Sequence, residues 1–83
     1  MNNAAAINVY PNPSRNVINI TGLDINDNVI LYDMMGRQQN QKWVAATTGT
    51  NSFQYSNLPA GGYILVIADA NGDTKARIPI MKQ

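Results

Sequence analysis

The apolar residues of this chain fall into short stretches, most of which alternate with polar residues. Residues 7–10 and 18–21 alternate with a period of two, which is typical of strands with one buried face. Residues 28–33 and 63–69 are more continuously apolar, which predicts strands buried on both faces. Residues 38–46, 51–55 and 74–81 are further candidates, and the last of these places Ala76, Ile78 and Ile80 on one face. No stretch shows helical periodicity over a useful length.

Prolines mark several boundaries of these stretches. Pro11 and Pro13 end the first strand, because proline lacks an N–H and restricts the residue before it. Pro59, followed by Gly61–Gly62, predicts a connection before the most apolar strand. Pro79 cannot donate to a ladder, so the last strand should lie at an edge of its sheet, or Pro79 should lie at a bulge.

Two hairpins are also predicted from turn residues. The segment from Asp33 to Gly36 suits a type I turn in a three-residue hairpin, with a bulge at the glycine. Asn71–Gly72 predicts a two-residue hairpin between two apolar strands. About seven short strands with turn signals every ~8–12 residues predict an all-β fold, a small immunoglobulin-like β-sandwich of about seven antiparallel strands. We expect this domain to span residues 7–83, with residues 1–6 as a linker or as a remnant left when the domain is excised from a longer protein.

The catalytic equipment of the chain is sparse. It has no His, Cys or Glu, which removes the commonest general base, the best nucleophile, disulfides and most transition-metal sites. Its five aspartates lie at predicted turns or strand ends, where aspartate commonly bonds backbone N–H groups. Residues 24–28 resemble the start of a calcium loop, but Val29 replaces the required glycine, which favours a polar turn. We therefore expect a non-enzyme with no catalytic, cofactor or metal site.

Charge and aromatic content narrow the function further. The formal net charge of +1 is too small for a nucleic-acid-binding surface. The longest apolar run, residues 63–68, is far shorter than the ~20 residues of a membrane span. Trp43 and the four tyrosines could form a sugar-stacking face, although packing is the favoured interpretation for Trp43. A non-catalytic immunoglobulin-like module that binds a glycan or a protein partner therefore remains an alternative function.

Three motifs follow one another along the chain. An apolar strand leads into Tyr10-Pro11-Asn12-Pro13, and a further apolar strand follows over residues 17–20. The next strand ends in Asp33-x-x-Gly36-Arg37, and Leu58-x-x-Gly61-x-Tyr63 precedes the most apolar stretch, with Gly62 at its variable place. A basic apolar strand over residues 75–82 closes the chain. In this order and spacing the motifs resemble type A C-terminal sorting domains of the type IX secretion system, the Por secretion family. The resemblance covers residues 7–83, and Pro79 departs from the family's plain final strand.

The resemblance implies a secretion signal that directs an upstream cargo protein across the outer membrane of Bacteroidetes-type bacteria. It implies the type IX translocon and a sortase-like peptidase as partners, with passage through the periplasm and then release or display at the cell surface. An exposed edge strand is a further candidate for pairing with a receptor or a second copy. The residues that we expect to be involved in recognition are Tyr10, Pro11, Asn12, Pro13, Asp33, Gly36, Arg37, Leu58, Gly61, Gly62, Tyr63 and Lys82.

Overall fold

The computed structural model describes residues 7–55 and 57–83, without the side chains of residues 40–42, and these residues form seven strands. The strands are β1 (Asn8–Tyr10), β2 (Val17–Leu23), β3 (Asn28–Asp33), β4 (Gln38–Val44), β5 (Gly49–Gln54), β6 (Gly61–Ala68) and β7 (Thr74–Lys82). Every predicted strand is present, with ends that differ by a few residues. In the described part of the chain there is no helix that is long and apolar enough to cross a membrane. The linker prediction for residues 1–6 lies outside the described residues.

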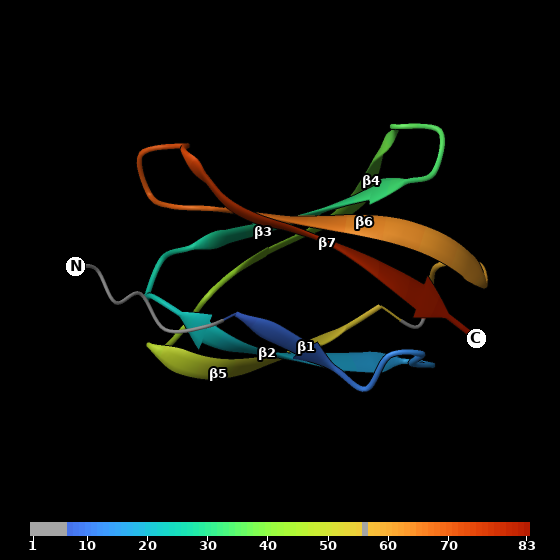
Figure 1. Cartoon of the computed structure of the whole chain (residues 1–83), viewed down its shortest axis with the longest axis horizontal. Coiled ribbons are helices and arrows are strands. Elements are labelled where there is room, and N and C mark those ends of the chain that lie inside the picture. The colour runs from blue at the N-terminus through green and yellow to red at the C-terminus, as the bar shows by residue number, and fades with distance from the viewer. Residues whose placement is uncertain (1–6, 56) are drawn as a thin grey trace.

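The strands form two antiparallel sheets that pack as the layers of a sandwich (Figure 1). One sheet has the order β1-β2-β5, and the other has the order β4-β3-β6-β7. Immunoglobulin-like domains place strands A, B and E in one sheet and C, F and G in the other, with an added strand beside C. The observed order follows that arrangement, with β4 as the added strand. The predicted all-β sandwich of antiparallel strands is therefore confirmed.

The core lies between the inner faces of the two sheets. Its fully buried side chains include Ile18, Ile20, Val29, Leu31, Leu65 and Ile67. Each large aliphatic side chain that is removed from water in this way stabilises the fold by about 1.5–3 kcal/mol. Trp43 packs against this cluster and stacks on Phe53, with ring centroids 4.9 Å apart and ring planes 15° apart. The packing interpretation of Trp43 is therefore confirmed.

The prediction that β3 and β6 are buried on both faces is wrong for β3 and holds only in part for β6. The inner-facing residues of both strands are buried, whereas Ile30, Tyr32 and Ile64 on the outer face are only half-buried. Val66 and Ala68, on the outer face of β6, are buried. A two-layer sandwich covers one face of each sheet, so the outer apolar residues of β3 and β6 have no second layer above them.

The turn between β6 and β7 also differs from the prediction. The N–H of Gly72 donates to the carbonyl of Asp69 (2.9 Å) and the N–H of Asp69 donates to the carbonyl of Asp73 (2.8 Å), so three residues form the loop rather than two. The Asp69 carboxylate accepts the N–H groups of Asn71 and Asp73, both at 2.9 Å, and Gly72 has a φ of 92°. The carboxylate favours the longer loop because it binds N–H groups that a two-residue turn would place elsewhere.

The last strand, β7, lies at an edge of its sheet, as Pro79 predicts. Pro79 is the partner of Ile64 on β6, and its nitrogen lies on the outward side of β7, so no ladder bond to β6 is lost.

At the end of the sandwich away from the chain's C-terminus, Lys75 of β7 binds the loop between β2 and β3. Its Nζ lies 2.7 Å from the buried Asp27 carboxylate and 3.0 Å from Asp24. The hydrogen bond to Asp27, and then the one to Asp24, raise the pKa of Lys75 above 10.5. The interpretation of residues 24–28 as a turn is confirmed, because the N–H of Asp27 donates to the carbonyl of Asp24 (3.0 Å).

Candidate functional site

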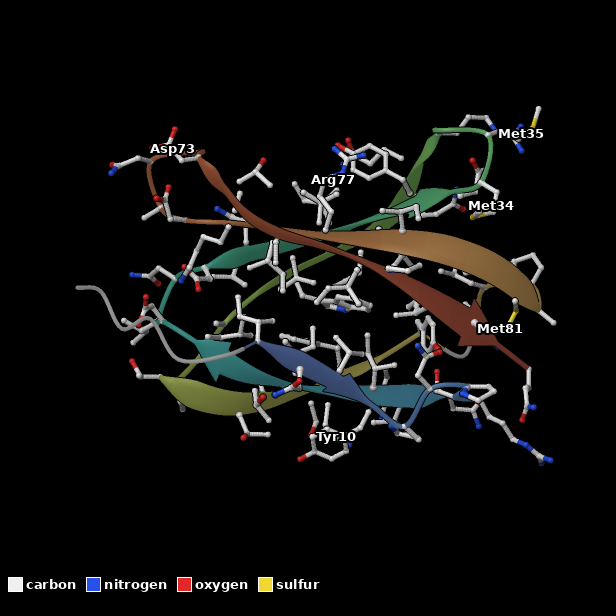
Figure 2. The ribbon with its side chains drawn as sticks, viewed as in Figure 1. Tyr10, Met34, Met35, Asp73, Arg77 and Met81 are labelled. Atoms are coloured by element: carbon white, nitrogen blue, oxygen red, sulfur yellow. The ribbon has the colours of Figure 1, made fainter. Side chains whose placement is uncertain are left out.

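The three motifs gather near one end of the sandwich (Figure 1). The loop that follows β1, the turn between β3 and β4, and the connection that leads into β6 all lie at the end where the chain's C-terminus emerges. Three methionines are exposed at this end: Met34 and Met35 on the β3–β4 turn, and Met81 on β7 (Figure 2). Segments far apart in the sequence therefore form one region, which we call the motif end.

Asn12, in the first motif, binds the last strand through its side-chain amide. Its Nδ2 donates to the carbonyl of Pro79 (3.3 Å), and its Oδ1 accepts the N–H of Met81 (3.0 Å). The amide thus takes the place of a neighbouring strand's peptide group along the outward side of β7. This part of the edge strand is covered by the chain itself.

Ser14 extends this attachment along β7. Its N–H donates to the carbonyl of Met81 (3.0 Å), and its carbonyl accepts the N–H of Gln83 (2.7 Å), which makes a short parallel bridge centred on Lys82. Its hydroxyl shares a hydrogen bond with that of the buried Tyr55. The Nζ of Lys82 lies 5.6 Å from the Tyr55 ring centroid, within range for a cation–π contact. The residues after the first motif therefore close the core at the motif end.

The second motif is a turn built around one carboxylate. Oδ1 of Asp33 accepts the N–H groups of Met35 and Arg37, both at 2.9 Å, and Oδ2 accepts Nε of Arg37 at 2.8 Å. The N–H of Gly36 donates to the Asp33 carbonyl (3.0 Å), and Gly36 has a φ of 84°, so the predicted three-residue hairpin is confirmed. The N–H of Arg37 is the main cause that holds the pKa of Asp33 below its ordinary value of 3.8. The loss of hydration opposes this shift, and the Arg37 side chain supports it.

The third motif forms a tyrosine corner, a feature of immunoglobulin-like sandwiches in which a tyrosine near the start of strand F bonds the backbone upstream. The hydroxyl of Tyr63 donates to the carbonyl of Pro59 (2.6 Å), and burial raises the pKa of Tyr63 above 10.0. Leu58 packs against the core. Met34 lies over Gly62, where an added Cβ would stand 3.2 Å from the Met34 Cγ. The third motif therefore fixes the start of β6 and receives a side chain from the second motif.

The structure divides the predicted recognition residues into two groups. The exposed members are Tyr10, Pro11, Asn12, Pro13, Gly36 and Arg37, and the half-buried or buried members are Asp33, Leu58, Gly61, Gly62, Tyr63 and Lys82. Tyr10 points away from the three-stranded sheet (Figure 2), whereas Arg37 lies on a turn of the other sheet. The second group has structural duties: its members form the turn, the corner and the cover over Tyr55.

Two residues of the motif end were not predicted. Ser14 and Tyr55 are both buried and share a hydrogen bond, yet they lie far apart in the sequence. Ser14 directly follows the first motif, and this adjacency is the one signal in the sequence that could have identified it. No sequence pattern marks Tyr55 as its partner.

Comparison with known proteins agrees with this geometry. Residues 8–81 match the family model described as a secretion system C-terminal sorting domain. The structure is similar to part of PorZ from Porphyromonas gingivalis, described as an essential bacterial surface component of the type-IX secretion system, with a TM-score of 0.71. The two are 22% identical over 93% of this chain and 11% of PorZ, so this likeness shows the fold alone. No curated protein matches the sequence.

The family match spans almost the whole chain, and it includes all three motifs and most of the final strand. The members of this family are non-catalytic signal domains of type IX secretion. This chain belongs to the family of type IX secretion system C-terminal sorting domains.

Proposed function

We propose that this domain carries an upstream cargo protein from the periplasm through the type IX translocon, and that a sortase-like peptidase then separates it from the cargo outside the cell. The observation that supports this proposal most directly is the construction of the motif end. There hydrogen bonds fasten the first motif to β7 and fix the second and third motifs internally, and a small set of side chains stays exposed. Such an arrangement suits recognition by a partner, because little conformational entropy is lost when preorganised groups bind.

Within the motif end, we propose that the exposed Tyr10, Pro11, Pro13 and Arg37 contact the secretion machinery. Their buried neighbours position them. The side chain of Arg37 is 76% exposed, and its Nε is oriented by the Asp33 carboxylate, so the rest of the guanidinium is presented outward in a defined direction. Arginine in such a position recognises carboxylates and carbonyls of a partner well.

The test is an export assay. Residues 1–83 are fused behind a periplasmic fluorescent reporter in a bacterium with an intact type IX system, and the reporter is measured in the medium and on the cell surface. We expect export of the wild-type fusion and a several-fold loss with Arg37→Ala. The matched control is Thr50→Ala, an exposed residue of β5 on the other sheet. If the wild-type fusion stays in the periplasm, as in a strain without the secretion system, the proposal is wrong.

The alternative of a glycan-binding module rested on Trp43 and on a polar, largely uncharged surface. That side chain packs against the core and stacks on Phe53, and no observation on the described residues favours a sugar-stacking face.

A further inference from the structure

The outer face of the four-stranded sheet carries an apolar block. Tyr32 of β3 lies opposite Ile64 of β6, and Ile30 lies opposite Val66, so four large apolar side chains form two adjacent cross-strand pairs. Val66 is only 8% exposed although it faces away from the core. The solvent face of an antiparallel sheet is ordinarily polar. No other part of the described chain forms a layer over this face (Figure 1).

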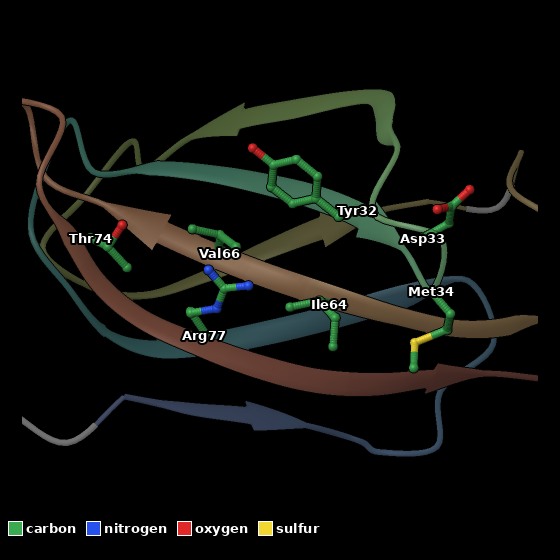
Figure 3. Close-up of a pocket in the computed structure, with 8 residues that line it drawn as sticks. Tyr32, Asp33, Met34, Ile64, Val66, Thr74 and Arg77 are labelled. Atoms are coloured by element: carbon green, nitrogen blue, oxygen red, sulfur yellow. The ribbon is translucent and has the colours of Figure 1, made fainter.

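A groove of about 480 Å³ runs across this face (Figure 3). Ile64 and Val66 form its centre, Tyr32 lies along one side, Met34 of the β3–β4 turn lies at one end, and Thr74 lies at the opposite end. Met34 is 67% exposed and unbranched, so it can adjust to a bound side chain. The groove therefore offers an apolar surface that the side chains of a binding partner can cover.

Two charged residues line the groove, Asp33 and Arg77, and Arg37 already pairs with Asp33. Arg77 is the β7 partner of Val66, and its side chain extends across the sheet beside Val66 (Figure 3). The ion pairs of the described residues join Lys75 to Asp24 and Asp27, and Arg37 to Asp33, and none includes Arg77. A guanidinium beside apolar surface and without a carboxylate partner in this part of the chain is suited to an acidic ligand.

We infer that this groove binds a short acidic and apolar segment of another protein. The apolar side chains of that segment cover Tyr32, Ile64 and Val66, and its carboxylate pairs with Arg77. A second copy of this chain fits less well. A symmetric contact centred on the groove brings Arg77 towards Arg77, and the carboxylate in the groove's lining, Asp33, is already bound by Arg37. The site shares the Met34 turn with the motif end but lies on a different surface.

The direct test uses the isolated 83-residue chain labelled with nitrogen-15 and two capped peptides, acetyl-Leu-Glu-Leu-Glu-Leu-amide and its Leu-Lys counterpart. We expect the acidic peptide to shift the amide signals of Tyr32, Ile64, Val66 and Arg77, and the basic peptide to bind at least about threefold more weakly, as one exposed ion pair allows. Equal binding of both peptides, no shifts on this face, shifts confined to the three-stranded sheet, or dimerisation through the face would each overturn the inference.

Two variants with the same net charge separate a specific site from a general charge effect. Arg77→Gln and Thr50→Glu each make the chain one unit more negative, but Thr50 lies on the other sheet. We expect Arg77→Gln to weaken the acidic peptide about threefold and Thr50→Glu to leave its affinity within experimental error. If both variants weaken binding equally, the site assignment is wrong. Ile64→Ser should abolish the shifts while the rest of the spectrum still shows a folded chain.

An export arm relates the groove to secretion and rests on the proposed function. In the reporter strain we expect Arg77→Gln to reduce export several-fold and Thr50→Glu to leave it unchanged. Failure of the wild-type fusion to be exported would count against the proposed function alone, because the peptide titration tests the groove independently. Full export of the Arg77→Gln fusion, with the wild type also exported, would overturn the role of the groove in secretion.

Discussion

Each of the two hairpin turns of the four-stranded sheet is built around the carboxylate of its own aspartate. Asp33 and Asp69 each accept two backbone N–H groups within their own loops, and each loop has a glycine with positive φ three residues later. The Asp-x-x-Gly part of the second motif is therefore a general solution for a three-residue hairpin. What sets the β3–β4 turn apart is Arg37, whose side chain binds the same carboxylate and stays exposed.

Replacing Gly36 by valine should lower the free energy of unfolding by about 1–2 kcal/mol, because a β-branched residue is strained at a φ of 84°. No atom lies within 4 Å of an added Cβ, so the backbone is the source of the cost. Gly72→Val should cost a similar amount, since Gly72 has a φ of 92° in an equivalent turn. Urea unfolding measures both. A Gly36→Val variant with the wild-type midpoint would contradict the strain explanation.

The lowered pKa of Asp33 predicts a dependence of stability on pH. A carboxyl whose folded pKa lies below its unfolded value stabilises the fold fully above the unfolded value, 3.8, and loses that contribution as pH falls through the folded value. The wild type should therefore lose stability more steeply than Asp33→Asn below about pH 4. Urea midpoints of both proteins, measured from neutral to acid pH, check this. Parallel curves would show that the hydrogen bonds to the carboxylate contribute nothing.

Among the strands, local features were predictable and distant pairings were not. Alternation and turn residues located all seven strands, and Pro79 indicated that β7 is an edge strand. The hydrogen bonds from Asn12 to Pro79 and Met81 join residues near opposite ends of the sequence, so no local pattern predicts them. The high apolar content of β3 and β6 correctly indicated strands, but it could not reveal that the outer face of their sheet has no covering layer.

Asn12→Ala should loosen the end of β7. Loss of the side-chain amide leaves the N–H of Met81 and the carbonyl of Pro79 without their partners, at a cost of about 1 kcal/mol. Hydrogen exchange at the Met81 amide should become faster, while amides in the centre of β6 should change only as far as global stability falls. Asn12→Asp is the control, since it keeps the acceptor for Met81. Equal exchange rates in wild type and Asn12→Ala would show that the Asn12 side chain does not protect β7.

At the scale of the whole molecule, β7 is fastened to other elements at both ends of a sandwich 38 Å long. The residues after β1 hold it at the motif end, and Lys75 holds it to the β2–β3 loop at the other end. A domain of this size buries only about 60% of its unfolded surface, so each attachment is a sizeable part of its stability. Both the motif end and the outer groove include residues of β7, so both attachments are needed to hold these two surfaces rigidly in place.

Lys75→Met should lower the free energy of unfolding by about 1–3 kcal/mol, because Asp27 remains buried after its cationic partner is lost. Combined with Asn12→Ala at the opposite end, the two costs should add to within about 0.5 kcal/mol, since the sites share no contact partner. Trp43 fluorescence reports the contact between the sheets and circular dichroism reports the strands, and both should follow one transition in urea. If the two probes followed separate transitions in the double variant, the ends of the sandwich would unfold independently. If its loss of unfolding free energy departed strongly from the sum of the two single losses, the ends would be coupled through β7.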